Sequence, residues 1–441
     1  MTPPSHSLLV LSALSLWANA ALGKVHQVAD VTQFDKAVKQ ATPGDSIVLQ
    51  SGEWHDADLH FRGVGTAAEP ITLRAAVAGS VRFVGNSRLR LSGAHLVVEG
   101  LWFLNALPRE SDIVAFRGDS KRLAEHCVLK DCAITQTQES QDQIERKWVS
   151  LYGRYNRVEH CHFEGKTSKG TLLVVWLPDA VGAPVAHRIE NNYFGPRPRL
   201  GKNGGEIIRI GDSAHSMQRA ECVVSGNFFE RCDGEVECIS NKSCGNLYDR
   251  NTFLECQGTL TLRHGNGCTV TGNFFYGNTR ASTGGIRVIG EDHTVRGNRL
   301  VGLRGDGARS AICLVNGLEN SPANGYFQVK RALIEANQLW DCHHNITIGY
   351  GDEDVTANQA PQACRFEKNQ VFSPSRSAFT LLEPRAEISW KGNEFWTKTE
   401  GSDQPSQPGI TFHAGPSPLP YPPRPVRRDE GLTWNLQNLS S

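Results

Sequence analysis

The chain has 441 residues and a formal net charge of zero, because 46 lysines and arginines balance 46 aspartates and glutamates. This balance excludes the global basic charge of nucleic-acid-binding proteins, so any cationic binding surface must be local. Glycine is abundant, with 43 residues, and long helical patterns are almost absent. Together these features favour a β-rich chain with many turns.

Residues 1–23 are interpreted as a signal peptide. A mostly apolar run from Leu8 to Leu16 precedes Ala18-Asn19-Ala20, which resembles a cleavage site of small residues, although MTPPSHS at the front lacks Lys and Arg. The run is too short to span a membrane, and the sequence offers no other candidate span. We therefore expect a secreted or periplasmic protein that does not interact with membranes.

The mature chain opens with elements typical of an end cap. VHQV at 25–28 reads as a strand, and the residues from Thr32 to Asp35 resemble a capping box. Phe34, Val38 and Ala41 follow at helical spacing, and Pro-Gly-Asp at 43–45 ends the helix. Short β-branched runs come next, at 46–49, 71–75 and 95–100.

A short phrase then recurs along the chain, with an apolar residue, two variable residues, often an Asn, and an aromatic or aliphatic residue. Successive steps of 24, 22 and 25 residues separate Asn227 from Asn298. A fixed period in this range indicates a stack of similar coils. The repeated asparagines are Asn192, Asn227, Asn251, Asn273, Asn298, Asn337, Asn369 and Asn393. Asn suits a sharp turn, where it tolerates a left-handed backbone and can bond to its counterpart in the next coil.

Three short strands fit a coil of 22 to 25 residues, which predicts an all-β fold, a right-handed parallel β-helix with a short N-terminal capping helix. We assign residues 24–399 to this domain and 400–441 to a Pro-rich tail, either wrapping or a truncated linker. Longer intervals between Asn192 and Asn227, and between Asn298 and Asn337, mark loops expected to build the binding face. With no second domain, a monomer is expected.

The twelve cysteines also follow the repeat. Cys132 and Cys161 stand where the repeat has Asn, and Cys232, Cys256 and Cys342 follow it at matching offsets. This pattern favours small inward-facing residues stacked between coils, with one or two disulfides left open. The chain has no CxxC pair, so a structural zinc site is not expected.

Two carboxylates carry the first sign of chemistry. Glu235 and Glu237 are two residues apart, so on a strand they share one face. Their repulsion calls for a cation, and Ca²⁺ prefers carboxylate and amide oxygens. Asn203 lies 32 residues upstream, about one coil plus a loop, and could supply an amide oxygen. Taken alone, the pair would equally suit two solvated glutamates on a strand surface.

Basic residues recur one coil apart beside this pair. Lys242, Arg263 and Arg287 are separated by 21 and 24 residues, so they are expected to stack on one face. His264 follows Arg263 and is a further candidate for the site, although a lone His is more often structural. A chance basic ladder that aids solubility is the competing interpretation.

These residues lie in stretches that resemble polysaccharide lyase family six, the alginate lyases and dermatan-cleaving chondroitinase B type enzymes. The stretches are NGGEIIRIGDS at 203–213, CISNKSCGNLYDRNTFLECQGTLTLRHGN at 238–266 and GGIRVIGEDHTVRGN at 284–298, with weaker likeness at 33–54 and 69–75. The resemblance implies a lyase whose basic lysine is Lys242 and whose acidic arginine is Arg263. It also implies that Asn203, Glu235 and Glu237 bind Ca²⁺ and that Arg287 is an arginine of alginate-acting members.

The resemblance therefore implies a calcium-dependent lyase that cleaves alginate, an anionic uronate polysaccharide, by β-elimination. We expect Lys242 as the base and Arg263 near the bridging oxygen, where it stabilises the leaving alkoxide because arginine rarely gives up its proton. Arg287 and His264 are expected to contact substrate. Three alternatives stay open: a lyase on dermatan sulfate, a β-helix glycoside hydrolase, and a non-catalytic polysaccharide-binding solenoid.

Overall fold

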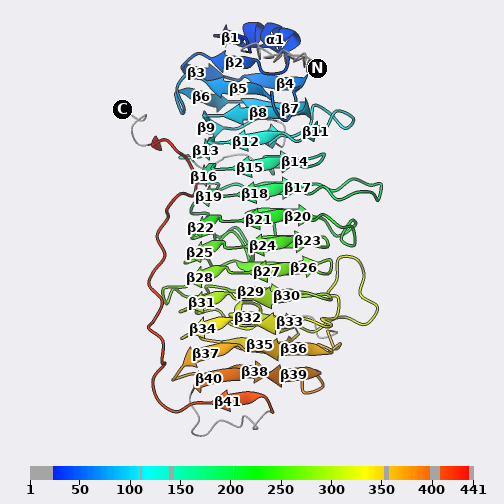
Figure 1. Ribbon diagram of the computed structural model, residues 1–441, viewed down its shortest axis with the longest axis vertical. Helices are drawn as coiled ribbons and strands as arrows, with labels where there is room; N and C mark the ends of the chain where they lie inside the picture. Colours follow the sequence, from blue (N-terminus) through cyan, green and yellow to red (C-terminus); the bar gives the residue numbers. More distant parts are fainter. Residues whose placement is uncertain are drawn as a thin grey trace, which may run out of the picture.

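In the computed structural model the chain winds into a right-handed parallel β-helix, an elongated stack of coils with three parallel sheets as its faces (Figure 1). The structure describes residues 23–109, 112–138, 144–201, 203–351, 357–397 and 408–436. Each coil gives one strand to each sheet, so every strand pairs with its counterpart in the next coil. The predicted fold class is confirmed. The predicted signal peptide lies outside the described residues except for Gly23.

The first sheet has 14 strands and runs from β1 (Val25–Val28) to β39 (Ile388–Lys391). The third sheet also has 14 strands, from β3 (Gly52–His55) to β41 (Ile410–Phe412). The second sheet has 13 strands and carries the candidate site. Its strands are β11 (Ala124–Glu125), β4 (Asp58–Val64), β7 (Arg88–Ala94), β10 (Asp112–Ala115), β14 (Lys147–Leu151), β17 (Leu173–Val175), β20 (Ile208–Gly211), β23 (Glu237–Lys242), β26 (Thr259–His264), β29 (Ile286–Val288), β32 (Ile312–Val315), β35 (Ile346–Tyr350) and β38 (Phe379–Leu381).

Helix α1 (Val31–Gln40) caps the N-terminal end of the stack and buries Phe34, Ala37 and Val38. Its N-cap is Asp30, whose side chain accepts the Gln33 backbone N–H at 2.8 Å. The Gln33 side chain in turn accepts the Ala29 N–H at 3.0 Å. The predicted capping box was therefore wrong by two residues, because Asp30 and Gln33 satisfy the free N–H groups of the first turn before Thr32 is reached.

The repeated asparagines form a continuous buried ladder. From Asn192 to Asn393, each side-chain amide donates to the Oδ1 of the next asparagine at 2.9–3.0 Å. Each Oδ1 also accepts the backbone N–H of the asparagine one coil earlier, as Asn273 does for Asn251 at 2.9 Å. The left-handed backbone was predicted at the asparagines themselves. It lies instead one residue earlier, for example at Arg250, which precedes Asn251 and has a φ of 50°. The ladder thus provides hydrogen-bond partners for backbone N–H groups at the turns, which are buried and cannot bond to water.

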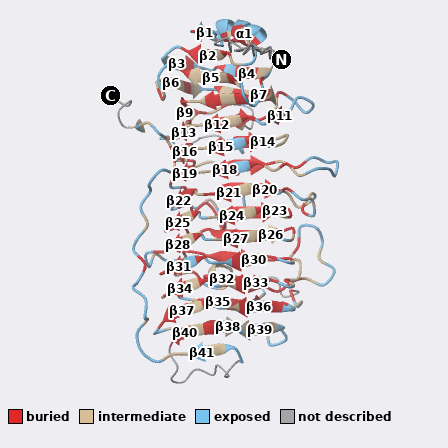
Figure 2. Cartoon of the chain, viewed as in Figure 1, coloured by how far each residue is buried: buried red, intermediate tan, exposed pale blue. Residues whose placement is uncertain are grey.

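Buried positions recur from coil to coil along the stack (Figure 2). Many of them are occupied by aromatic residues and cysteines. Phe229, Phe253 and Phe275 stack with centroids 4.7 and 4.4 Å apart. All twelve cysteines are buried and free, as the stacking interpretation predicted. Cys161 extends the asparagine column, since its backbone N–H donates to Asn192 Oδ1 at 2.9 Å.

Two fully buried histidines predict how stability depends on pH. His187 and His293 each accept a backbone N–H on Nδ1 at 3.1 Å, which requires a neutral ring. Burial lowers the pKa of His187 to about 3 and of His293 to about 4, from an ordinary value of 6.5. Below pH 6.5 these histidines therefore bind protons in the unfolded chain but stay neutral in the folded chain. The free energy of unfolding decreases as the pH is lowered from about 6.5 to about 4.

The melting temperature of the protein is thus expected to drop by several degrees between pH 7.5 and pH 4.5. The double variant His187→Asn, His293→Asn provides the comparison, since Asn246 already plays the same accepting role toward the Cys222 N–H at 2.8 Å. A double variant that loses as much thermal stability on acidification as the parent would contradict this assignment.

The segment 408–436 runs back along the third sheet as an extended strap (Figure 1). After β41, Tyr421 lies edge-on against Trp340 with ring centroids 6.0 Å apart. Farther along, Arg424 pairs with Glu255 at 3.2 Å. Near its end, Thr433 donates to both Asp131 carboxylate oxygens at 2.7 Å. The described part of the tail, residues 408–436, therefore lies against the coils of the β-helix, as a wrapping tail would.

No helix in the described ranges is long and apolar enough to cross a membrane.

Candidate functional site

The second sheet borders a cavity of about 880 Å³ that contains all seven residues singled out from the sequence. They are Asn203, Glu235, Glu237, Lys242, Arg263, His264 and Arg287. Three neighbouring strands, β23, β26 and β29, carry most of them, and Glu235 lies just before β23. The two long intervals predicted to be loops also contribute to the lining, through Asn203 from the first and Asn324 and Tyr326 from the second.

The cations share the cavity but do not form the straight row that their spacing predicted. Strand pairing aligns Lys242 with His264, while Arg287 aligns with Thr261. Strand β26 has a β-bulge at this point: Asn241 pairs with Leu262 and Lys242 pairs with His264, so Arg263 is the extra residue between them. A bulge turns a side chain out of its regular alternation. Arg263 and His264 can therefore both reach the cavity although they are adjacent in sequence.

Three carboxylates gather at one side of the cavity, from Glu206, Glu235 and Glu237, all of them buried. Burial and the negative charges of Glu206 and Glu237 raise the pKa of Glu235 to about 9. Its Oε2 is buried and has no hydrogen-bond partner among the described residues. An unpartnered buried oxygen beside two other carboxylates is a group that a cation would stabilise.

The residues present fit Ca²⁺, which takes six to eight oxygen ligands, some from water. In the part of the chain that the structure describes, no three His, Cys, Asp or Glu side chains converge closely enough to hold a metal by themselves. An ion held by Glu235 and Glu237 would therefore also need the Asn203 amide, water or substrate oxygens. Asn203 is exposed at the rim of the cavity, where its side chain is accessible to such an ion.

Lys242 and Arg263 differ in how firmly they are held. The half-buried Lys242 side chain lines the cavity and makes no hydrogen bond or ion pair with any described residue, and a lysine carries its amine on a flexible four-carbon stem. The Arg263 guanidinium donates to Gly325 O at 2.6 Å and Asn324 O at 3.0 Å, and lies 4.1 Å from the centre of the Tyr326 ring. Arg263 is therefore a fixed positive charge beside an adaptable amine.

Arg287 and His264 complete the wall. The Arg287 guanidinium is 5.4 Å from the Tyr326 ring centre and donates to its hydroxyl at 3.4 Å. His264 is 1% exposed, with Nε2 3.2 Å from Ser213 Oγ and Nδ1 3.4 Å from an Arg263 nitrogen. Burial and the charges of Arg263 and Lys242 lower the pKa of His264 to about 3, so its ring stays neutral.

Sequence reasoning missed Glu206 and Tyr326. Glu206 stands three residues after Asn203 in NGGE, a spacing that signals nothing by itself. Tyr326 lies in the insertion between Asn298 and Asn337, which was expected to build the binding face without any residue being named. It contacts Arg263 and Arg287, two of the three arginines that line the cavity.

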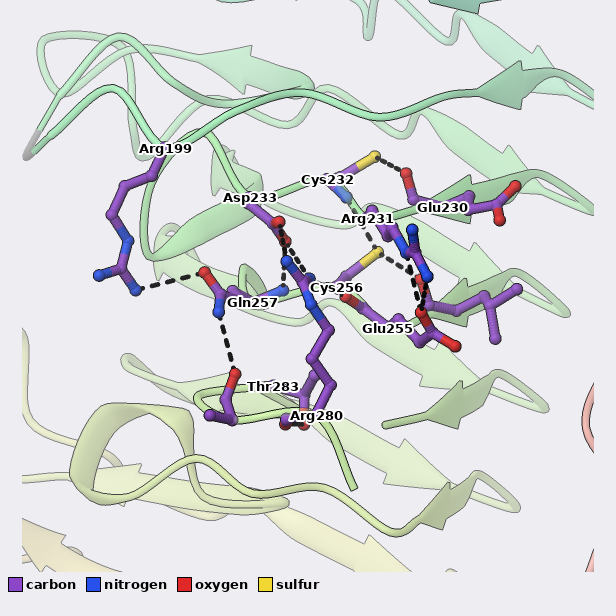
Figure 3. A network of polar contacts seen from close by, with 12 residues as sticks. Arg199, Glu230, Arg231, Cys232, Asp233, Glu255, Cys256, Gln257, Arg280 and Thr283 are labelled. Carbon is purple, nitrogen blue, oxygen red and sulfur yellow. Dashed lines mark hydrogen bonds and ion pairs between the residues drawn. The ribbon is translucent and has the colours of Figure 1, made fainter. Parts of the chain in front are cut away.

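Tyr276, Arg280 and Arg209 lie outside the cavity lining. Tyr276 belongs to the third sheet, on β28 (Phe274–Tyr276). Arg280 belongs to a separate polar cluster, where it pairs with Asp233 at 2.7 Å (Figure 3). In the same view Arg199 donates to Gln257 at 3.3 Å. Arg209, on β20, lies over the Trp176 ring at 5.2 Å.

Comparison with known proteins matches the same region to one family. The family model described as chondroitinase B matches residues 28–376. Comparison with curated sequences found no match. Among solved structures, the family-six (PL6) alginate lyase AlyGC shares 39% identity with a TM-score of 0.83, over 88% of this chain and 53% of its own. The chain therefore spans about half the length of that relative.

Two further structures match over nearly their whole length. A mannuronic-acid-specific family-six lyase from human gut microbiota is 30% identical with a TM-score of 0.81, over 89% of this chain and 91% of its own. The family-six lyase Pedsa3628 from Pseudopedobacter saltans is 26% identical with a TM-score of 0.77, over 93% and 99%. On the extent of the family model and these likenesses, the chain belongs to the chondroitinase B family of polysaccharide lyases, family six.

Proposed function

We propose that the protein is a calcium-dependent lyase that cleaves alginate by β-elimination and releases unsaturated uronate oligosaccharides. One observation carries the proposal: the Lys242 amine, the Arg263 guanidinium and a cluster of buried carboxylates line the same cavity. The likeness to alginate lyases at 39% and 30% identity supports alginate as the substrate.

The reaction begins with Lys242, whose neutral amine takes the proton from C5 of the uronate. The electrons of that C–H bond form the C4–C5 double bond, and the C4–O bond to the neighbouring sugar breaks. Arg263 is held by two carbonyls and Tyr326, so its charge stabilises the departing oxygen without rearrangement, and water supplies the proton. Arg287 forms a charge-assisted pair with a carboxylate of a neighbouring sugar.

A calcium ion held by Asn203, Glu235 and Glu237 would act as a Lewis acid that neutralises the substrate carboxylate next to the carbon losing its proton. The unpartnered Glu235 oxygen supports this assignment. The neighbouring Glu206 adds a third negative charge, and its carboxylate accepts a hydrogen bond from the Thr171 hydroxyl at 3.0 Å.

Incubation with defined polymers tests the substrate and the reaction together. The protein is incubated separately with poly-mannuronate, poly-guluronate and mixed alginate, and at least one of these should give the ultraviolet absorbance of the new conjugated double bond. Absorbance with dermatan sulfate alone would assign the chondroitinase B activity instead. New reducing ends without absorbance would indicate a hydrolase, and binding without any product a non-catalytic solenoid.

Residues 1–23 and the fold suit export, and we propose a secreted or periplasmic monomer on the grounds given by the sequence.

A further inference from the structure

Arg197 is a buried cation that lies beside the cavity carboxylates but outside the cavity lining. It is 1% exposed, and its guanidinium donates to four backbone carbonyl oxygens. These are Glu206 O at 2.7 Å, Ser168 O and Gly170 O at 2.9 Å each, and Gly204 O at 3.0 Å. Burial of a charged group is costly unless hydrogen bonds replace its water. The four peptide groups are therefore fixed relative to one another through this one side chain.

The four carbonyls belong to two segments in consecutive coils. Two of them precede β17, and the other two, from Gly204 and Glu206, precede β20, which pairs with β17. Arg197 itself follows β19 (Tyr193–Phe194) of the third sheet. The loop between β19 and β20 is the long interval that carries Asn203. The Arg197 side chain thus joins the start of this loop to its end, where the chain enters the second sheet.

The contact with Gly204 sets the direction of the next backbone N–H. The Gly204 carbonyl and the Gly205 N–H belong to one peptide group, and in a trans peptide these two bonds point in opposite directions. Gly204 O is turned toward Arg197, so the Gly205 N–H is turned away from it, and it donates to the Glu235 carboxylate. An N–H directed at a carboxylate favours its charged form, which is the form that binds a cation.

The same loop packs directly against the residue before Glu235. A Cβ on Gly205 would lie 2.3 Å from the Gly234 carbonyl carbon, and a Cβ on Gly234 would lie 2.1 Å from Gly205 O. Only glycines allow two backbones to approach so closely. The 203–206 segment is therefore held between Arg197 on one side and the backbone next to Glu235 on the other.

We propose that Arg197 is a positioning residue for the cation site. It holds the 203–206 segment in the shape that presents the Asn203 amide and the Glu206 carboxylate to an ion bound at Glu235. This role rests on the proposed function, because that function supplies the Ca²⁺. When the ligands are already in place, less binding free energy is lost in ordering them, so Arg197 acts on the affinity for the ion.

Calcium titration of the chelator-treated protein by isothermal titration calorimetry tests this role without any turnover. Arg197→Lys keeps the positive charge, but an ammonium has only three N–H groups and cannot bond to four carbonyls from two segments. We expect its Kd for Ca²⁺ to be at least about tenfold higher than that of the parent, as is typical when a group that orients metal ligands is lost.

Arg304→Lys is the matched control for this titration. Arg304 follows β31 (Arg299–Val301) of the third sheet, donates to Leu303 O at 3.1 Å and pairs with Asp341 at 2.7 Å. It therefore holds a turn as Arg197 does, but a turn that does not carry the 203–206 segment. Its Kd for Ca²⁺ should equal that of the parent.

The dependence of activity on Ca²⁺ separates positioning from general stability. In Arg197→Lys the Ca²⁺ concentration that gives half of the maximal rate should rise by at least about tenfold, while kcat at saturating Ca²⁺ stays within about twofold of the parent. A lower melting temperature with an unchanged Kd for Ca²⁺ would overturn the positioning role and leave the calcium assignment intact. Failure of the parent itself to bind Ca²⁺ would refute both.

Hydrogen exchange of the parent protein provides a measurement that needs no variant. Peptides that cover the 203–206 segment should exchange their amides slowly in chelator and change little when Ca²⁺ is added, because Arg197 already holds the segment. Fast exchange in chelator that becomes slow only with Ca²⁺ would show that the ion orders the segment, and would overturn the proposal.

Discussion

Lys242→Ala is expected to lower kcat on alginate by about 10³-fold or more, because a positioned general base contributes on the order of 10²–10⁴ to the rate. The melting temperature should stay within about a degree of the parent. Lys242 is half-buried and has no partner within the described residues, so its removal leaves no buried group unsatisfied. Initial rates followed by ultraviolet absorbance, together with a thermal melt, provide both measurements.

Lys242→Arg separates the role of base from that of charge. Arginine keeps the positive charge but does not give up its proton near neutral pH, so this variant should be as inactive as Lys242→Ala. Lys391→Ala is the control, since Lys391 is exposed on β39 of the first sheet, and its activity should equal that of the parent. Substantial activity in Lys242→Arg would show that the residue acts through its charge alone.

Removal of calcium is expected to stop turnover and lower the melting temperature, with both restored by added Ca²⁺. Binding to the folded state alone adds about 2.7 kcal/mol of stability when the free ion is at a hundredfold excess over Kd. Without a cation, Glu235 stays buried beside Glu206 and Glu237, and burial together with these two negative charges raises its pKa to about 9. Thermal melts with chelator and with Ca²⁺ measure the effect independently of activity.

Glu235→Gln keeps the shape of the side chain but removes its charge. We expect this variant to lose activity and the response of its melting temperature to Ca²⁺, while its stability in chelator equals or exceeds that of the parent. Glu335→Gln, on β33 (Leu333–Glu335) of the first sheet, should behave like the parent in each assay. Full activity after exhaustive chelation would rule out the metal assignment.

The fold could be predicted because the asparagine ladder appears in the sequence as an asparagine that recurs once per coil. A buried amide that bonds to its counterpart one coil away must recur once per coil, and its neighbours must alternate between the interior and the surface. The candidate site followed from the same period and from the family likeness. Coil spacing predicted that Lys242, Arg263 and Arg287 share one face, and the structure places all three in the lining of one cavity.

The remaining features depend on geometry that a period does not encode. The bulge at Arg263 shifts the register by one residue, and only strand pairing reveals it. Tyr326 reaches the cavity from an insertion whose path does not follow the repeat. The strap has no periodicity, so contacts such as Thr433 with Asp131, 302 residues apart, could not be placed from the sequence.

In a stack where each coil contacts only its neighbours, the coils at either end can unfold one after another without disrupting the rest. The strap changes this behaviour, because it joins the last coil to coils near Asp131 and Tyr193, and Arg427 lies 4.4 Å from the Tyr193 ring. The C-terminal coils cannot peel away while that tether holds. Unravelling from this end must therefore begin with the detachment of the strap itself, which ties the coils around the cavity into one cooperative unit.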